Sequence, residues 1–336
     1  MFKNKKLLIT GGTGSFGKTF LNKILKKDCK EIVIFSRDEK KQHDLRSNNA
    51  QKNLRFVIGD IRDKESIYGA LKNIDYVFHA AALKQVPSCE FYPMEAVKTN
   101  IIGTENLINM CSLNKIRKLV CLSTDKAVEP INAMGLSKAM MEKVIISHAR
   151  KKASDKMDIC ITRYGNVLGS RGSVLHTFIN QIKNIEPLTI TDPNMTRFLM
   201  TLDEAIDLVL MALKVGKNGE IFVQKSPAAN TLSVANAVRI LFGKPDHPIK
   251  YIGARHSEKI HESLLSQTEM QNIKKFKNYF IIPGDKRDLN YENFYTKGKK
   301  IKILKQYSSD LTNSLSPNQI IKLINDNHDL KQLFKN

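Results

Sequence analysis

LLITGGTGSFGK, residues 7–18, joins an apolar run to a helix-like pattern through closely spaced glycines. This order predicts a buried strand, a tight turn and a helix start. Gly11 allows the sharp turn, Gly14 lets backbone N–H groups approach a pyrophosphate, and Gly17 lets the helix pack closely against the strand. The phosphates would then lie at the positive end of the helix. The stretch therefore indicates a dinucleotide-binding loop.

Further apolar runs alternate with helical patterns through the first half of the chain. They predict strands at residues 31–35, 54–58, 75–79, 118–122 and 157–163. This alternation indicates right-handed βαβ units, and hence an α/β fold with a Rossmann-type doubly wound parallel sheet. Ligands bind at the carboxyl ends of the strands in such a sheet.

The parallel pattern weakens in the second half of the chain. We expect a dinucleotide-binding domain at 1–166, to which some later segments return, and a smaller substrate-binding lobe with a tail at 167–336. A helix is predicted over 230–242 with Thr231 or Ser233 as its cap. The tail after about residue 285 is polar and suggests no chemistry.

Composition narrows the class of partner. The formal net charge is +21, but the lysines are spread along the chain without a basic stripe interleaved with aromatic residues. We therefore expect anionic small ligands rather than nucleic acid or a membrane surface. The five cysteines show neither CxxC nor metal-ligand spacing, so no metal site is expected. No apolar run is long enough for a membrane span and no signal-peptide core begins the chain, which predicts a cytoplasmic location.

The end of the second predicted strand bears on the choice of cofactor. Ser36, Arg37 and Lys41 favour NADP, because a hydroxyl and cations can hold a 2′-phosphate. Asp38 argues for NAD unless it caps the next helix. Asp60, after the third strand, either reaches the adenine amino group or caps the helix that follows it.

The alanines at 80–82 leave room for a cofactor after the fourth strand. Lys84 beside them either faces the bound ligands or is an ordinary surface lysine. The residues expected to contact the cofactor are Gly11, Thr13, Gly14, Ser15, Phe16, Gly17, Ser36, Arg37, Lys41, Asp60, Ile61, Ala80, Ala81, Lys84, Asn100 and Lys138.

The sequence Ser-Thr-Asp-Lys at 123–126 follows the fifth strand and should lie beside the nicotinamide. A hydroxyl, a carboxylate and an ammonium in succession can donate, accept and shuttle protons. An ordinary polar turn is the alternative. Lys138, in a helix predicted from about 132 to 152, is spaced to point at the same crevice.

Together these motifs resemble the extended short-chain dehydrogenase/reductase family. The likeness is narrowest to its bacterial UDP-N-acetylglucosamine 4,6-dehydratases that invert C5, in the capsule-type branch. It is carried by TGGTGSFG (10–17), FSRDEKKQ (35–42), HAAALKQVP (79–87), KTNIIGT (98–104), LSTDKA (122–127), NAMGLSKAMMEK (132–143), RYGNV (163–167), SRGSV (170–174) and MTRF (195–198).

One position departs from the general family pattern, which uses a Tyr-xxx-Lys pair. Met134 occupies the tyrosine position, and a thioether cannot take a proton from a sugar hydroxyl. Either the chain is a catalytically weak relative, or another group does this work. The capsule-type branch shares the methionine and is regarded as active, which favours the second interpretation.

The resemblance implies NADP-dependent dehydration of UDP-N-acetylglucosamine to a UDP-4-keto-6-deoxy-L-hexosamine for capsule, O-antigen or another surface polysaccharide, with or without epimerisation at C3. It also suggests a homo-oligomer, such as a hexamer. A UDP-sugar 4-epimerase and a non-catalytic NADP-binding regulator are the alternatives.

The resemblance also assigns roles to residues. Lys126 would be the base, with a pKa lowered by Lys138 and the nicotinamide. Asp125 would protonate the departing C6 hydroxyl, and Thr124 would bond the O4 oxygen. The residues expected to bind the substrate are Lys84, Tyr164, Asn166, Val167, Arg171, Arg197, Arg255 and Glu258.

Overall fold

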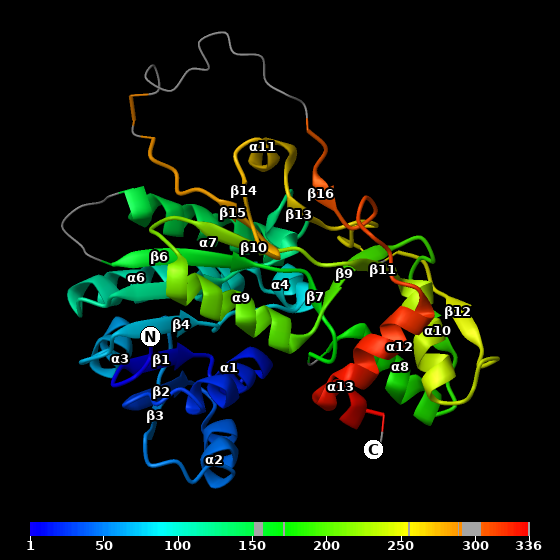
Figure 1. Cartoon of the computed structure of the whole chain (residues 1–336), viewed down its shortest axis with the longest axis horizontal. Helices are drawn as coiled ribbons and strands as arrows, with labels where there is room; N and C mark the ends of the chain where they lie inside the picture. Colours follow the sequence, from blue (N-terminus) through cyan, green and yellow to red (C-terminus); the bar gives the residue numbers. More distant parts are fainter. Residues whose placement is uncertain (151–156, 171, 255, 288, 291–303, 335–336) are drawn as a thin grey trace.

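A nine-stranded sheet forms the centre of the computed structural model, which describes residues 1–150, 157–170, 172–254, 256–287, 289–290 and 304–334 (Figure 1). Its strands are, in spatial order, β14 (Lys274–Phe276), β15 (Tyr279–Ile282), β10 (Ile221–Gln224), β6 (Asp158–Arg163), β5 (Lys118–Leu122), β4 (Tyr76–His79), β1 (Lys6–Thr10), β2 (Glu31–Ser36) and β3 (Leu54–Ile58). The strands from β10 to β3 are parallel, and β15 and β14 pair antiparallel at one edge. The predicted Rossmann-type sheet is confirmed.

Helices cover both faces of this sheet. One face packs against α3 (Lys64–Ala70), α6 (Gly103–Leu113) and α7 (Ala133–Arg150). The opposite face packs against α1 (Ser15–Leu25), α2 (Glu39–Ser47) and α9 (Leu202–Val215). Both faces are buried, which is why the strands read as continuous apolar runs.

Segments beyond residue 166 complete the first sheet and its helical layers. They supply α9, β10, β14 and β15. The chain therefore returns to the first sheet after leaving it.

A second part has its own apolar core and lies beside one end of the sheet (Figure 1). Its elements are β7 (Asn166–Val167), α8 (Val174–Lys183), β8 (Leu188–Ile190), β9 (Thr196–Met200), β11 (Ala228–Asn230), α10 (Thr231–Leu241), β12 (Ile249–Tyr251), α12 (Pro317–Asp326) and α13 (His328–Gln332). The shorter elements β13 (Ser263–Leu265), α11 (Gln267–Met270) and β16 (Tyr307–Ser308) pack against the core of the first sheet, on the side of α7.

Some local predictions were wrong. Asn230 caps α10 in place of Thr231 or Ser233, because its side chain accepts a 2.7 Å hydrogen bond from the Ser233 N–H. The polar-looking tail contributes Ile320 of α12 and Leu330 of α13 to the second core, because each of these helices buries apolar side chains and exposes polar ones.

The helix before β5 is continuous but not uniformly α-helical. It consists of α5 (Pro93–Ala96), a π-helical segment η1 (Val97–Ile102) and α6. Before it, α4 (Val86–Phe91) follows the loop after β4. Within the described residues, no helix has the length and apolar character of a membrane span.

Candidate active site

The glycine loop follows β1 and precedes α1. Gly11 has a φ of +63°, and a Cβ there would lie 2.8 Å from the Ala81 nitrogen. A Cβ on Gly17 would lie 2.4 Å from the Cα of Gly12, so the helix packs this closely only because residue 17 is glycine. No described side chain caps α1, whose N-cap is Gly14. The N–H groups of Ser15 and its neighbours are therefore available to an anion, which fits a dinucleotide pyrophosphate.

The polar residues predicted for cofactor choice gather where β2 ends. The Thr13 and Ser36 hydroxyl oxygens are 2.9 Å apart. Asp38 caps α2 by accepting a 2.9 Å hydrogen bond from the Lys41 N–H, and it also pairs with the Lys41 ammonium. The carboxylate that argued for NAD is thus turned toward α2. The Arg37 side chain is 51% exposed.

Asp60 lies at the end of β3 but does not cap α3, because Asp63 fills that position. Asp60 instead pairs with Arg62 at 2.7 Å and with Arg37 at 3.5 Å. Burial acts to raise the pKa of Asp60, but the two guanidinium groups outweigh it and the pKa is lowered. Ile61 is buried in the core under this turn.

The loop after β4 is held close to the glycine loop. The N–H groups of Ala80 and Ala81 donate to the Thr10 carbonyl and hydroxyl oxygens at 3.2 and 3.3 Å. Asn100 is fully buried, and its amide makes two hydrogen bonds to the Leu83 main chain, at 2.8 and 2.9 Å. The structure thus shows Asn100 positioning this loop, and its predicted cofactor contact stays a prediction.

Three further predicted residues lie on α7 and in the loop after β4. Lys138 is buried and donates a 2.7 Å hydrogen bond to the Leu122 carbonyl, and burial lowers its pKa to about 8. Met134 is 4% exposed and packs with Cys89 and Ala96 in a small apolar cluster. Lys84, after β4, is an exposed residue, and partial burial of its ammonium lowers its pKa.

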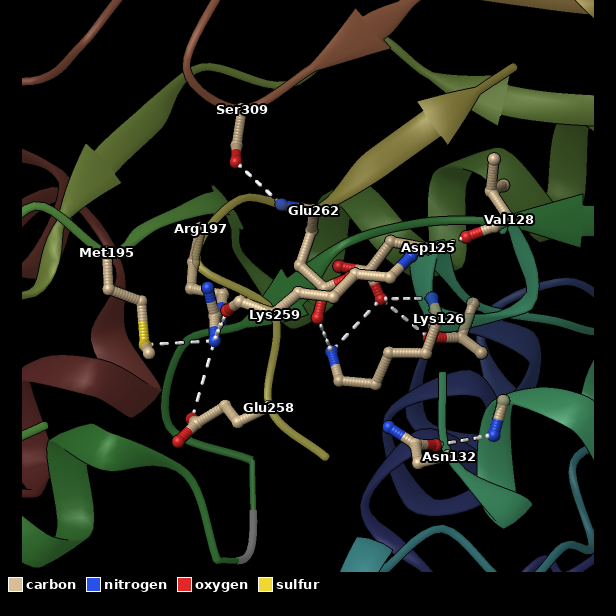
Figure 2. A network of polar contacts seen from close by, with 12 residues as sticks. Asp125, Lys126, Val128, Asn132, Met195, Arg197, Glu258, Lys259, Glu262 and Ser309 are labelled. Atoms are coloured by element: carbon tan, nitrogen blue, oxygen red, sulfur yellow. Dashed lines mark hydrogen bonds and ion pairs between the residues drawn. The ribbon is translucent and has the colours of Figure 1, made fainter. Parts of the chain in front are cut away.

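Figure 2 shows the polar cluster at the end of β5, formed by Asp125, Lys126 and Glu262. Asp125 and Lys126 lie in a 3-10 turn, η2 (Asp125–Ala127). The Lys126 Nζ lies 3.2 Å from Asp125 Oδ1 and 3.3 Å from Glu262 Oε1. Thr124 donates a 2.8 Å hydrogen bond to Asp125 Oδ1. Asp125 Oδ2 and Glu262 Oε2 are buried without a partner among the described residues, so this Asp125–Lys126–Glu262 cluster can still accept hydrogen bonds from a ligand.

The expected lowering of the Lys126 pKa is wrong for this structure. Burial does lower the pKa of Lys126, but the adjacent carboxylates of Asp125 and Glu262 raise it, and the net change is upward. The expectation failed because it counted the cation of Lys138 and left out two carboxylates, that of Asp125, which has the larger effect, and that of Glu262.

Sequence reasoning missed Glu262. It lies in the loop before β13, outside every motif, and its main chain is fixed by Ser309 from the C-terminal segment. The Glu262 N–H donates to Ser309 Oγ at 3.0 Å, and the Ser309 N–H donates back to the Glu262 carbonyl at 2.8 Å. The one signal in the sequence is a carboxylate placed directly before an apolar strand.

Of the arginines predicted to bind the substrate, Arg197 is the one that the structure describes. Arg197 donates to the Ile260 and Lys259 carbonyls at 3.0 and 2.9 Å and lies 3.4 Å from Glu258 (Figure 2). Arg197 therefore holds the loop before Glu262 in place, and its predicted contact with the substrate stays a prediction. Arg171 and Arg255 lie outside the described residues.

The residues after β6 flank the glycine loop. The Tyr164 ring stacks on Phe16 with 4.9 Å between centroids, and burial raises the Tyr164 pKa. The Tyr164 carbonyl accepts a 2.9 Å hydrogen bond from the Asp125 N–H. Asn166 Oδ1 is buried without a described partner, whereas Val167 is part of an apolar cluster.

Comparison with known proteins gives consistent matches. A family described as "Polysaccharide biosynthesis protein" matches residues 7–284. A UDP-glucose 4-epimerase of Rickettsia bellii (strain OSU 85-389) is 54% identical over 329 residues, which is 96% of each chain. The X-ray structure of Pen from Bacillus thuringiensis is 37% identical, with a TM-score of 0.88 over 97% of this chain and 99% of that one. A dTDP-glucose 4,6-dehydratase from Streptomyces venezuelae, with NAD bound, shares the fold at 21% identity, a TM-score of 0.69, and 76% and 86% coverage.

Proposed function

The chain belongs to this family of polysaccharide biosynthesis proteins, and from that premise we propose that it is a UDP-N-acetylglucosamine 4,6-dehydratase that inverts C5. The observation that supports this most is the contact between Asp125 and Lys126 at the carboxyl end of β5, beside the glycine loop. Elimination of water needs an acid and a base on neighbouring sugar carbons, and this pair can supply both. A UDP-sugar substrate agrees with the name of the Rickettsia relative.

The overall change is loss of one water from the sugar. A bound nicotinamide would accept a hydride from C4 and return it to C6. The 4-ketone acidifies C5, so its proton leaves with the C6 hydroxyl as water. A proton then returns to the opposite face of C5, which inverts that centre.

The Asp125–Lys126 contact provides the acid and the base through one internal proton transfer. At rest, Lys126 is an ammonium, because the neighbouring carboxylates raise its pKa. Moving one proton across the 3.2 Å contact gives a neutral amine and a carboxylic acid. Entry of the sugar excludes water and weakens the ion pair relative to this neutral form. The amine then takes the C5 proton, and Asp125 protonates the leaving hydroxyl.

We assign NADP as the cofactor. Ser36 and Arg37 lie at the end of β2, and Asp38 is committed to the α2 cap. A fluorescence titration should show tighter binding of NADP than of NAD. Arg37→Ala should remove most of this preference, because a guanidinium bond to a phosphate is worth about 1.5–3 kcal/mol. Tighter binding of NAD by the unaltered protein would contradict the assignment.

The activity is tested by incubation with UDP-N-acetylglucosamine and NADP. Mass spectrometry should show loss of one water, and NMR should show the inverted configuration at C5. Lys126→Ala should bind the cofactor but lower turnover by about 10²–10⁴-fold, the usual contribution of a general base. Turnover by Lys126→Ala at the wild-type rate would exclude Lys126 as the base.

A UDP-sugar 4-epimerase is the second candidate, because the Rickettsia relatives carry that name. Epimerisation also begins with oxidation at C4 but removes no water. An unchanged product mass with inversion at C4 would therefore favour the epimerase.

A further inference from the structure

The proposed function requires the protein to hold or release the O4 proton of the sugar during the reaction. Oxidation at C4 releases the O4 proton before any other proton transfer takes place. During elimination, the C5 proton leaves and the C6 hydroxyl receives one, so that step consumes as many protons as it releases. The O4 proton must therefore reside on the protein, or leave it, until the reaction cycle closes.

The described groups around Lys126 narrow the choice of storage site. The Met134 thioether cannot hold a proton and is buried among apolar side chains. Asp125 must be free to exchange a proton with Lys126 during elimination. Glu262 is the remaining carboxylate in contact with the Lys126 ammonium, at 3.3 Å, and its side chain is 3% exposed.

We propose that Glu262 is the proton store of this site, loaded through Lys126 when the sugar is oxidised at C4. Lys126 takes the O4 proton while it passes one of its own protons to Glu262 Oε1. The ammonium is thereby restored, and Glu262 becomes a carboxylic acid. When C5 takes its final proton from water, Glu262 returns its own to water through Lys126, whose side chain is 23% exposed.

The surroundings of Glu262 suit a group that gains and loses a proton. Lys126 and Asp125 face Glu262 from η2, and Arg197 faces it from β9. Lys259 lies in the same loop as Glu262. The neighbouring His261 is exposed, and its ring forms a hydrogen bond with the Thr196 hydroxyl. Burial raises the Glu262 pKa and Asp125 raises it further, so the net shift is upward despite the nearby cations. Ser309 holds the Glu262 main chain, so the carboxyl can change charge without loss of its position.

This inference rests on oxidation at C4, which both candidate functions share. The probe is a UDP-N-acetylglucosamine analogue whose 6-hydroxyl is replaced by hydrogen. It can be oxidised at C4 but cannot lose water. Absorbance of the reduced nicotinamide, followed in a single turnover across pH, measures this first step alone. Failure of the wild type to dehydrate UDP-N-acetylglucosamine would refute the dehydratase and leave this measurement interpretable.

In the wild type, cofactor reduction should slow as pH falls through the raised Glu262 pKa, because a Glu262 that is already protonated cannot accept the O4 proton. Glu262→Gln should slow cofactor reduction by about 10²-fold or more at neutral pH, and its rate should no longer fall at low pH. Glu262→Asp should keep the fall in rate at low pH. Glu129→Gln, which removes an exposed carboxylate beside the same turn, should match the wild type.

Binding of UDP and thermal unfolding show whether each variant is folded. If folded Glu262→Gln reduces the cofactor at the wild-type rate, with the same fall in rate at low pH, the proposal is overturned. The O4 proton would then go to Asp125 or directly to water.

Discussion

At the scale of single residues, Met134 occupies a position expected to matter for catalysis, but its contacts are those of a packing residue. Met134→Ala would leave a cavity beside Cys89 and Ala96, so we expect the free energy of unfolding to fall by about 2–5 kcal/mol. Met140→Ala, on the same helix but 52% exposed, should change it by no more than about 0.5 kcal/mol. Urea unfolding measures both, and equal losses would contradict the packing role.

The residues of the Asp125–Lys126–Glu262 cluster differ in how far sequence predicts them. Asp125 and Lys126 could be placed because they directly follow a recognisable strand, and topology brings strand ends to one edge. Glu262 could not, because its position depends on a loop held by Ser309 and Arg197 from distant segments. The predicted direction of the Lys126 pKa shift was wrong for another reason, because the adjacent carboxylate of Asp125 raises this pKa more than Glu262 does and was not counted.

At the scale of elements, the junction of β1, the glycine loop and α1 is packed too closely to accept an added side chain. Gly17→Ala would put a Cβ 2.7 Å from the Gly11 carbonyl oxygen and 2.4 Å from the Gly12 Cα, so α1 must move away from the loop. We expect loss of cofactor binding and a destabilisation of about 1–3 kcal/mol from overpacking. Calorimetric titration with NADP and thermal unfolding check both effects.

The matched control is Gly69→Ala, inside α3, where a new Cβ meets nothing within 4 Å. That variant should gain about 0.5–1 kcal/mol of helix stability and keep cofactor binding. If Gly17→Ala and Gly69→Ala had the same cofactor affinity and the same stability, the glycine loop would not be tightly packed.

The elements themselves were largely predictable, because each buried strand is one apolar run bounded by turn residues. The resemblance to the extended short-chain dehydrogenase/reductase family is confirmed at the level of the family by the 7–284 match. The π-helical η1 and the Asn230 cap were not predictable, since both depend on shifts of a single residue in hydrogen bonding.

At the scale of the whole molecule, one buried cation joins the sheet to the segment that carries Glu262. Arg163, at the end of β6, is 2% exposed and bonds both carboxylate oxygens of Glu142 on α7 and of Glu269 on α11. It also donates to the Leu264 carbonyl at 3.0 Å. These bonds fix β13 and α11 against the sheet, and so fix the loop before them. A homo-oligomer stays a prediction at this scale.

Glu269→Gln keeps the shape of this contact but removes one of the two negative charges on Arg163. Burial acts to raise the pKa of Glu269, but Arg163 and the Ser266 bonds outweigh it, so the folded-state pKa lies below its usual 4.5. A group with a lowered pKa stabilises the fold above its unfolded pKa, and this contribution is lost as pH falls through the folded one. We expect the variant to lose about 1–3 kcal/mol at neutral pH, a deficit that shrinks below pH 4.5. Urea unfolding across pH measures this difference in stability, with Glu186→Gln, at an exposed position, as the control. A difference that does not vary with pH would contradict the charge pairing of Glu269 with Arg163.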